Sequence, residues 1–175
     1  MAVKLAVADT SVLINLHYLG QLDSLSVFYR QVLIPGEVRV EFLKRTENRP
    51  SRENTLLALE REGLFSPCND YSISDVDRFK INKLDRGEAE ALSQLKMRGA
   101  DISLIDEKRG RRVAKKEMQK VEGTALILAR LHILGVLDIH RSIEVLRSED
   151  PHIQVTDQIV QEALDMAKKE RDINR

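Results

Sequence analysis

The sequence has a single cysteine, no long hydrophobic run near its start and no excess of charge of either sign. Cys68 alone cannot form an internal disulfide, so a disulfide-built secreted fold is excluded and a reducing cytoplasm is expected. The first apolar run, at residues 3–8, is interrupted by Lys4 and ends before Asp9, well short of the roughly 18 residues of a membrane span. We therefore expect a cytoplasmic protein without export signal or membrane association.

The 28 Lys and Arg residues balance the 28 Asp and Glu residues, so net charge gives no general attraction to nucleic acid or membrane. The 175 residues, 42% hydrophobic and 32% charged, fit one folded domain of ordinary size. One segment after Asp106 is locally basic, and its cationic residues are Lys108, Arg109, Arg111, Arg112, Lys115, Lys116 and Lys120. Such a run is usually a solvated helix face, and RNA binding is the alternative interpretation.

Short strand-like segments alternate with longer stretches of helical periodicity. The strand-like segments are residues 3–8, 32–34, 64–66, 102–105 and 119–121, and the helical ones are 10–18, 36–44, 53–62, 87–98, 108–118 and 124–134. This alternation predicts an α/β fold, with a central parallel sheet of about five strands covered by helices on both faces.

The chain after Gly135 shows only helical signals, at residues 142–147 and 156–171, with Asp150-Pro151 between them. We expect a main domain at residues 1–140. A helical C-terminal extension, residues 141–175, is expected to pack on or beside that domain.

Two aspartates directly follow predicted strands: Asp9 in Val-Ala-Asp-Thr-Ser and Asp106 in Leu-Ile-Asp-Glu. In open α/β sheets the functional crevice lies beyond the carboxyl ends of the strands, so both are candidate site residues. Each alone is also well placed to cap a following helix, which is the commoner role of an Asp at this position.

Two glutamates strengthen the functional interpretation. Glu88 shares a helix face with Ala91, Leu92 and Leu95, and Glu41 lies beside Phe42 on the inward side of its own helix. Glu90, by contrast, has polar i+3 and i+4 neighbours and is expected to face water. Buried carboxylates need a cation or hydrogen bonds, so inward-facing acids near a strand end indicate a metal site, and a salt bridge to Arg or Lys is the alternative.

The acids are accompanied by no cluster of histidine and cysteine. Oxygen ligands alone favour Mg²⁺ or Mn²⁺ over Zn²⁺.

Several short segments of the sequence resemble those of a known protein family. The segments that carry the resemblance are Asp9-Thr-Ser-Val-Leu-Ile-Asn15, Val38-x-x-Glu41-Phe42, Gly87-Glu-Ala-Glu-Ala91, Ile105-Asp106, Arg112-Val-Ala114 and Gly123-Thr124. They resemble PIN-domain proteins, most closely the DUF3368 branch related to VapC-type toxins, over about residues 3–137. Where the best-known toxins have an Asp as third acid, this chain has Glu88.

The resemblance implies a PIN-like three-layer αβα sandwich and a metal-dependent ribonuclease. By position, Asp9, Glu41, Glu88 and Asp106 would hold one or two divalent ions, which neutralise charge on the phosphoryl oxygens and activate water. The implied role is the toxin of a toxin–antitoxin pair, blocked by a small antitoxin protein. This branch more often has a second Asp where this chain has Glu107. It stays open whether Glu107 assists metal binding through a water molecule.

Hydroxyl and basic residues near the acids are candidates for substrate binding. Thr10, Ser11 and Thr124 lie at helix starts, where hydroxyls and free N–H groups hold phosphate or cap the helix. Arg109 and Arg112, three residues apart, are expected to reach the cleft.

Other readings remain open. A catalytically silent PIN-like module that binds RNA or protein is the main alternative, and an aspartyl-phosphate phosphatase is a further one. Nucleotide binding is disfavoured, because no glycine-rich phosphate loop follows the first strand. The sequence leaves open whether the protein forms a homodimer.

Overall fold

The computed structural model describes residues 4–44, 51–150 and 155–173. Its strands are β1 (Lys4–Ala8), β2 (Tyr29–Pro35), β3 (Phe65–Cys68), β4 (Ile102–Leu104) and β5 (Val121–Glu122). They form one sheet in the order β3-β2-β1-β4-β5, in which every neighbouring pair is parallel. The predicted α/β fold with a five-stranded parallel sheet is confirmed. Residue 3, the expected start of the first strand, and Pro151 lie outside the described residues.

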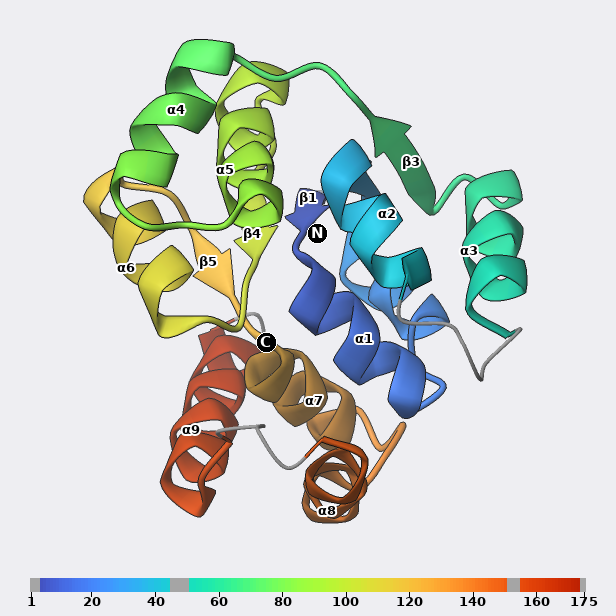
Figure 1. Cartoon of the computed structure of the whole chain (residues 1–175). Helices are drawn as coiled ribbons and strands as arrows, with labels where there is room; N and C mark the ends of the chain where they lie inside the picture. The colour runs from blue at the N-terminus through green and yellow to red at the C-terminus, as the bar shows by residue number, and fades with distance from the viewer. Residues whose placement is uncertain (1–3, 45–50, 151–154, 174–175) are drawn as a thin grey trace.

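Helices connect and cover these strands (Figure 1). Within the described residues they are α1 (Thr10–Tyr18), α2 (Gly36–Lys44), α3 (Ser51–Arg61), α4 (Ile73–Ile81), α5 (Arg86–Arg98), α6 (Lys108–Lys116), α7 (Thr124–Ile133), α8 (Ile139–Glu149) and α9 (Asp157–Ile173), with a short 3₁₀ helix at Asp23–Val27. The predicted bounds of α1 and α2 agree with the structure at both ends. Neither α4 nor the 3₁₀ helix was predicted.

Alternate residues of each strand face opposite sides of the sheet, and each side has its own layer of helices. Val7 and Leu33 pack with Ala91 and Leu95 of α5 on one side. Ala6 belongs to the larger core on the other side, which α1 and α7 cover. The fold is therefore the three-layer αβα sandwich that the sequence predicts.

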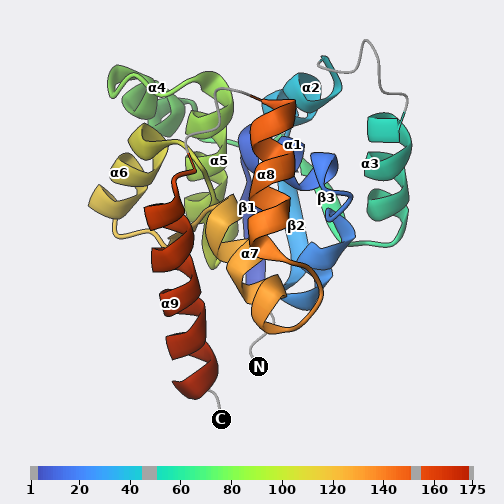
Figure 2. The ribbon, with the colours of Figure 1, turned by 90° about the horizontal axis from the view of Figure 1, so that it is seen from below.

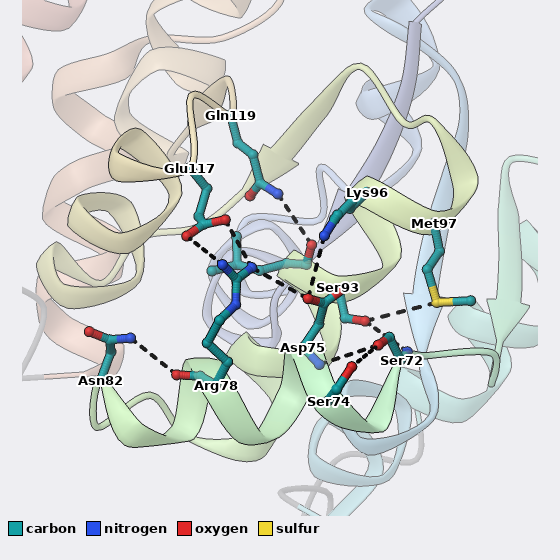
Figure 3. A network of polar contacts seen from close by, with 11 residues as sticks. Ser72, Ser74, Asp75, Arg78, Asn82, Ser93, Lys96, Met97, Glu117 and Gln119 are labelled. Atoms are coloured by element: carbon teal, nitrogen blue, oxygen red, sulfur yellow. Dashed lines mark hydrogen bonds and ion pairs between the residues drawn. The ribbon is translucent and has the colours of Figure 1, made fainter.

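The helices α4, α5 and α6 form a group on one side of the sheet, held together by both apolar and polar contacts. Val76 and Phe79 of α4 are buried with Leu92 of α5. At the polar edge, Arg78 of α4 forms an ion pair with Glu117, which ends α6 (Figure 3). These contacts hold the three helices together as a group, and the starts of α5 and α6 lie next to the candidate acids.

Glu90 was expected to face water, and this expectation is wrong. The side chain is 2% exposed, accepts a hydrogen bond from Arg86 Nε at 2.9 Å and forms an ion pair with it. The reason is the packing of other segments on this face of α5. Glu90 Oε2 accepts the backbone N–H of Glu37, at the start of α2, at 3.2 Å. Ser93, one turn after Glu90, is fully buried and accepts a hydrogen bond from the backbone N–H of Ser72, which precedes α4 (Figure 3).

The C-terminal helices pack on the main body. Figures 1 and 2 both show α7 between α8 and α9. Apolar side chains of both helices, among them Ile143 and Leu164, belong to the same core as the sheet. Arg130 of α7 forms ion pairs with Glu122 of β5 and Glu170 of α9, which fixes α9 to the sheet edge. No helix in the described part of the chain has the length and apolar character to cross a membrane.

The strand order reverses between β1 and β4. From β1 the chain builds β2 and β3 toward one edge, and then returns to place β4 and β5 on the other side of β1. The connections that follow β1 and β4 therefore diverge at the carboxyl ends of these two strands. Open α/β sheets form their ligand crevice at such a place.

Candidate active site

Asp9 and Asp106 lie at this reversal point. The backbone N–H of Asp9 donates to the carbonyl of Leu104 at 2.9 Å, which aligns the end of β1 with the end of β4. Asp106 follows two residues after Leu104. The sheet thus brings together two acids that are almost a hundred residues apart in the sequence.

Asp9 is buried, 4% exposed, at the N-cap position of α1, yet its side chain makes no capping hydrogen bond. Its Oδ2 instead accepts a hydrogen bond from the Ser11 hydroxyl at 2.8 Å. Burial is the main cause that raises the pKa of Asp9 from 3.8 to about 7; the Ser11 bond opposes the rise, and the negative charges of Asp85 and Asp106 add to it. Helix capping therefore does not explain this carboxylate.

Asp106 is held by neutral donors from two helices. Its Oδ1 accepts the backbone N–H of Thr124 at 2.7 Å, and its Oδ2 accepts the Thr124 hydroxyl at 2.6 Å. The side-chain amide of Asn15 on α1 donates to the same Oδ2 at 2.9 Å. Asp106 thus binds the start of α7, not of the helix that follows it. A carboxylate offers about four acceptor sites, so these three bonds leave room for a further ligand.

Glu88 belongs to a capping box at the start of α5. Its backbone N–H donates to Asp85 Oδ1 at 2.8 Å, and its Oε2 accepts the backbone N–H of Asp85 at 3.2 Å. The other oxygen, Oε1, is buried and has no hydrogen-bond partner among the described residues. Burial, together with the charges of Asp85, Asp9 and Glu107, raises the pKa of Glu88 from 4.5 to about 8 against the lowering effect of the Asp85 N–H.

Glu41 reaches the site from α2. Its Oε2 accepts a hydrogen bond from the Thr10 hydroxyl at 2.7 Å, so the first residue of α1 links Glu41 to the neighbourhood of Asp9. A Cβ placed on Gly87 would lie 3.4 Å from Glu41 Oε2 and 3.6 Å from Asp85 Oδ1. Glu41 and Asp85 therefore approach each other over the start of α5. The sequence prediction missed Asp85, although the spacing Asp85-x-x-Glu88 is itself a capping-box signal.

Two glycines allow backbone to pack directly against the acids. A Cβ on Gly110 of α6 would lie 2.5 Å from Glu88 Oε1, and one on Gly123 would lie 2.8 Å from Asp106 Oδ1. Distances this short have no room for a methyl group. The starts of α6 and α7 thus pack directly against the carboxylates of Glu88 and Asp106, which explains part of the burial of these two side chains.

The buried and half-buried acids of the protein fall into two classes. Glu90 is neutralised by Arg86, and Glu122 by Arg130 and by a hydrogen bond from the Tyr29 hydroxyl. Within the described residues, the four predicted site acids form no ion pair with Lys or Arg; they are Asp9, Glu41, Glu88 and Asp106. The salt-bridge alternative for Glu41 and Glu88 is therefore not seen in this part of the chain.

The donor set fits a hard divalent cation. Every ligand candidate is a carboxylate oxygen, and Glu88 Oε1 is buried without a hydrogen-bond partner among the described residues. The charge of Asp106 raises the pKa of Asp9 and the charge of Asp9 raises the pKa of Glu88, repulsions that a cation would relieve. No three His, Cys, Asp or Glu side chains of the described residues come close enough to hold one ion together. Mg²⁺ requires no such cage, because it usually keeps several waters and binds one or two carboxylates.

A groove of about 870 Å³ opens from Asp106. The predicted contacts Arg109 and Arg112 line it, and so does Arg111, which the sequence prediction did not select. Arg111 lies close to Asp106, because a Cβ on Gly123 would meet both side chains. Arg109 donates to the Lys83 carbonyl at 2.9 Å, which holds it against the loop before α5.

The outer face of α6 adds a second cationic surface. A hollow of about 540 Å³ is lined by the five residues Lys108, Arg111, Arg112, Lys115 and Lys116. These residues recur at three- and four-residue steps and therefore share one helix face. We call this face the basic face of α6.

The predicted substrate-binding hydroxyls each have a carboxylate partner in the structure. Thr10 donates to Glu41, Ser11 to Asp9 and Thr124 to Asp106. They position the acids, and their contact with substrate stays a prediction. Asn15, which also donates to Asp106, was not predicted as a site residue; the signal in the sequence is a buried amide on an otherwise apolar helix.

The family model described as DUF3368, PIN domain, matches residues 5–169. The match extends past residue 137, where the resemblance seen in the sequence ends, and it includes α8 and most of α9. None of the curated proteins matches the chain.

Proposed function

Because the chain belongs to the DUF3368 family of PIN domains, a class whose members are generally nucleases that use divalent metals, we propose that it is a metal-dependent ribonuclease. The observation that carries the proposal is the set of four carboxylates at the β1–β4 reversal. They lie in a buried or half-buried site without a cationic partner among the described residues, while other buried acids of the same fold have one. A structural role alone would not require this difference.

Asp9, Glu88 and Asp106 would hold the ion, one or two of them directly and the others through its waters, with Glu41 at the edge of the site. Mg²⁺ or Mn²⁺ suits these ligands. When bound, the ion supplies charge neutralisation at the phosphate and a water of lowered pKa. Hydrolysis of this type needs no nucleophile from the protein.

The chain's own groups hold the acids in place. Thr124 and Asn15 fix both oxygens of Asp106, and Ser11 fixes one oxygen of Asp9. These donors are neutral, so they orient the carboxylates without competing for their charge. Arg111 lies beside Asp106 in the groove and is the best placed cation to contact a phosphate of the bound strand.

The resemblance to VapC-type proteins supports a finer proposal: a toxin whose activity a small antitoxin protein blocks. We place its action in the cytoplasm, where RNA is abundant and the unpaired Cys68 stays reduced.

The test is cleavage of a mixed pool of labelled RNA by the purified protein with Mg²⁺, with Mn²⁺ or with EDTA. The variants are Asp9→Asn and Asp106→Asn, and Glu144→Gln is the control. Glu144 lies exposed on α8, outside the site, whereas Glu90 would be a poor control because it is buried and ion-paired.

Metal-dependent cleavage that is lost in both Asp variants and kept in Glu144→Gln supports the proposal. Cleavage that persists in EDTA, or that survives both Asp variants, contradicts it. A phosphate group trapped covalently on Asp9 or Asp106 would favour the phosphatase instead. If wild-type protein neither cuts RNA nor binds Mn²⁺, the silent interaction module is the better reading.

A further inference from the structure

The groove that opens from Asp106 has a second wall formed by α9. On one wall lie Arg109, Arg111 and Arg112 from the α6 segment. On the other lie Ile159, Glu162 and Met166. Figure 2 shows the start of α9 beside α6 at this side of the molecule. The C-terminal helix therefore borders the same space as the candidate acids.

The α9 wall is a fixed surface. Residues 159, 162 and 166 are separated by three and four positions, so they share one face of the helix. The adjacent face is buried in the main core through Val160, Leu164 and Ala167, among others. The ion pair between Arg130 and Glu170 holds the later part of the helix. A ligand in the groove thus meets a preformed wall.

The two walls differ in chemistry. The α6 wall is cationic and suits a phosphate backbone. The α9 wall offers two apolar side chains, with Met166 52% exposed, and one carboxylate, Glu162. Phosphates would be repelled by Glu162, so a bound strand would turn its backbone to α6 and its bases to α9. Apolar surface suits the faces of bases, and a carboxylate accepts a hydrogen bond from an exocyclic amino group.

We propose that α9 is the base-contacting wall of the substrate groove, and that the groove takes single-stranded RNA with an amino-bearing base against Glu162. The inference rests on the proposed ribonuclease function and deepens it. A single strand is required, because the base edges of an RNA duplex are paired and its major groove is too narrow for side chains to read. Cytosine would be preferred over uracil, since uracil has a carbonyl where cytosine has the amino group.

The experiment measures binding of short labelled oligo(C) and oligo(U) by fluorescence anisotropy in EDTA, so that binding is read without cleavage. The variants are Met166→Ala and Glu162→Gln. Met97→Ala is the matched control for the first, because Met97 is 50% exposed on α5, outside the groove. Asp165→Asn is matched to the second: Asp165 accepts a hydrogen bond from Gln161, just as Glu162 accepts one from Gln158, both at 2.9 Å.

We expect Met166→Ala to weaken binding of both oligonucleotides about fivefold, and Glu162→Gln to reduce the oligo(C) to oligo(U) affinity ratio about tenfold. The affinity ratio is the decisive readout, since removing any negative charge strengthens binding of all RNA alike. Met97→Ala is expected to bind both oligonucleotides as wild type does, and Asp165→Asn is expected to keep the wild-type affinity ratio while binding both slightly more tightly.

Equal affinities of wild type and the α9 variants would overturn the inference. So would a loss of affinity in Met97→Ala equal to that in Met166→Ala, or a fall of the affinity ratio in Asp165→Asn equal to that in Glu162→Gln. Absence of single-stranded RNA binding by wild type would overturn it as well and would favour a protein occupant. The ribonuclease proposal is decided separately, by the cleavage assay. If the wild type and both α9 variants cleave RNA with Mn²⁺ and also bind the oligonucleotides equally well, the inference about α9 is refuted and the ribonuclease proposal stands.

Discussion

Replacing Glu88 by glutamine is expected to make the metal-free protein more stable at alkaline pH, although the change is made in a candidate catalytic residue. Glutamine can replace glutamate at the third position of a capping box, because its side-chain oxygen also accepts a hydrogen bond. The hydrogen bond from the Asp85 backbone N–H is therefore kept. What the change removes is a buried negative charge, which lies near Asp9 and Asp85. The variant therefore isolates the electrostatic cost of the site from its local structural role.

The size of this stability difference, and the pH range over which it develops, follow from the pKa of Glu88, which is about 8 in the folded protein against an ordinary 4.5. Below pH 4.5 the carboxyl is protonated in both states and costs nothing. Between 4.5 and 8 the unfolded chain has lost the proton while the folded protein still holds it, so stability falls as pH rises. Each pKa unit corresponds to about 1.4 kcal/mol, so the cost is on the order of 5 kcal/mol above pH 8 and below about 1 kcal/mol at pH 5.

The assay is urea unfolding followed by far-UV circular dichroism in EDTA, at pH 5 and at pH 8.5, because the sequence has no tryptophan for fluorescence. Glu88→Gln should exceed wild type by several kcal/mol at pH 8.5 and by far less at pH 5. Glu144→Gln, an exposed change on α8, should match wild type at both values. Adding Mn²⁺ at pH 8.5 should stabilise wild type more than the variant.

If Glu88→Gln is no more stable than wild type at pH 8.5, the reasoning is refuted, because some other group must then stabilise the buried charge of Glu88. An equal gain at both pH values would also refute it and would assign the effect to packing.

Three further changes have expected outcomes. Thr124→Val removes the hydroxyl that holds the acid at the end of β4 but keeps the side-chain shape; it should weaken Mn²⁺ affinity about tenfold in a titration, at a stability cost of about 1 kcal/mol. Gly110→Ala places a methyl group against Glu88 Oε1 and should destabilise the protein by about 1–3 kcal/mol in urea unfolding. Arg130→Met leaves Glu122 buried without its cation, so its melting temperature should fall by an amount equivalent to about 3 kcal/mol; an unchanged value would show that the ion pair adds no stability.

The fold was predictable from the sequence because its strands are short apolar runs between helices with regular periodicity. Strands buried on both faces of a parallel sheet read as continuous hydrophobic segments. Helix α4 was missed because only Val76 and Phe79 of its residues are buried, too few for a clear periodic pattern. The error at Glu90 has a different cause: the start of α2, whose Glu37 backbone N–H donates to Glu90, covers a face of α5 that was expected to meet water, and the sequence does not show how two helices approach each other.

The site was predictable where it depends on the sheet and less so where it depends on packing. Asp9 and Asp106 follow strands, and the rule for strand ends applies to them without tertiary information. The contributions of Asp85 and Asn15 depend on how α5 and α1 approach those strand ends. Arg111 was passed over in favour of its neighbours because a helix periodicity does not show which cation lies beside the carboxylate of another segment.

The placement of cations in this fold separates structural acids from functional ones. Glu90 and Glu122 show that the chain places an arginine beside a buried acid where burial serves packing alone. At the β1–β4 reversal the donors to Asp9 and Asp106 are hydroxyls, an amide and a backbone N–H, although Arg111 lies close by in the groove. Acids held by neutral donors remain free to bind a cation from solution, and the buried charges of Asp9 and Glu88 destabilise the fold until one binds. Such a cost is expected at a functional site, because a sequence selected for stability alone would not retain it.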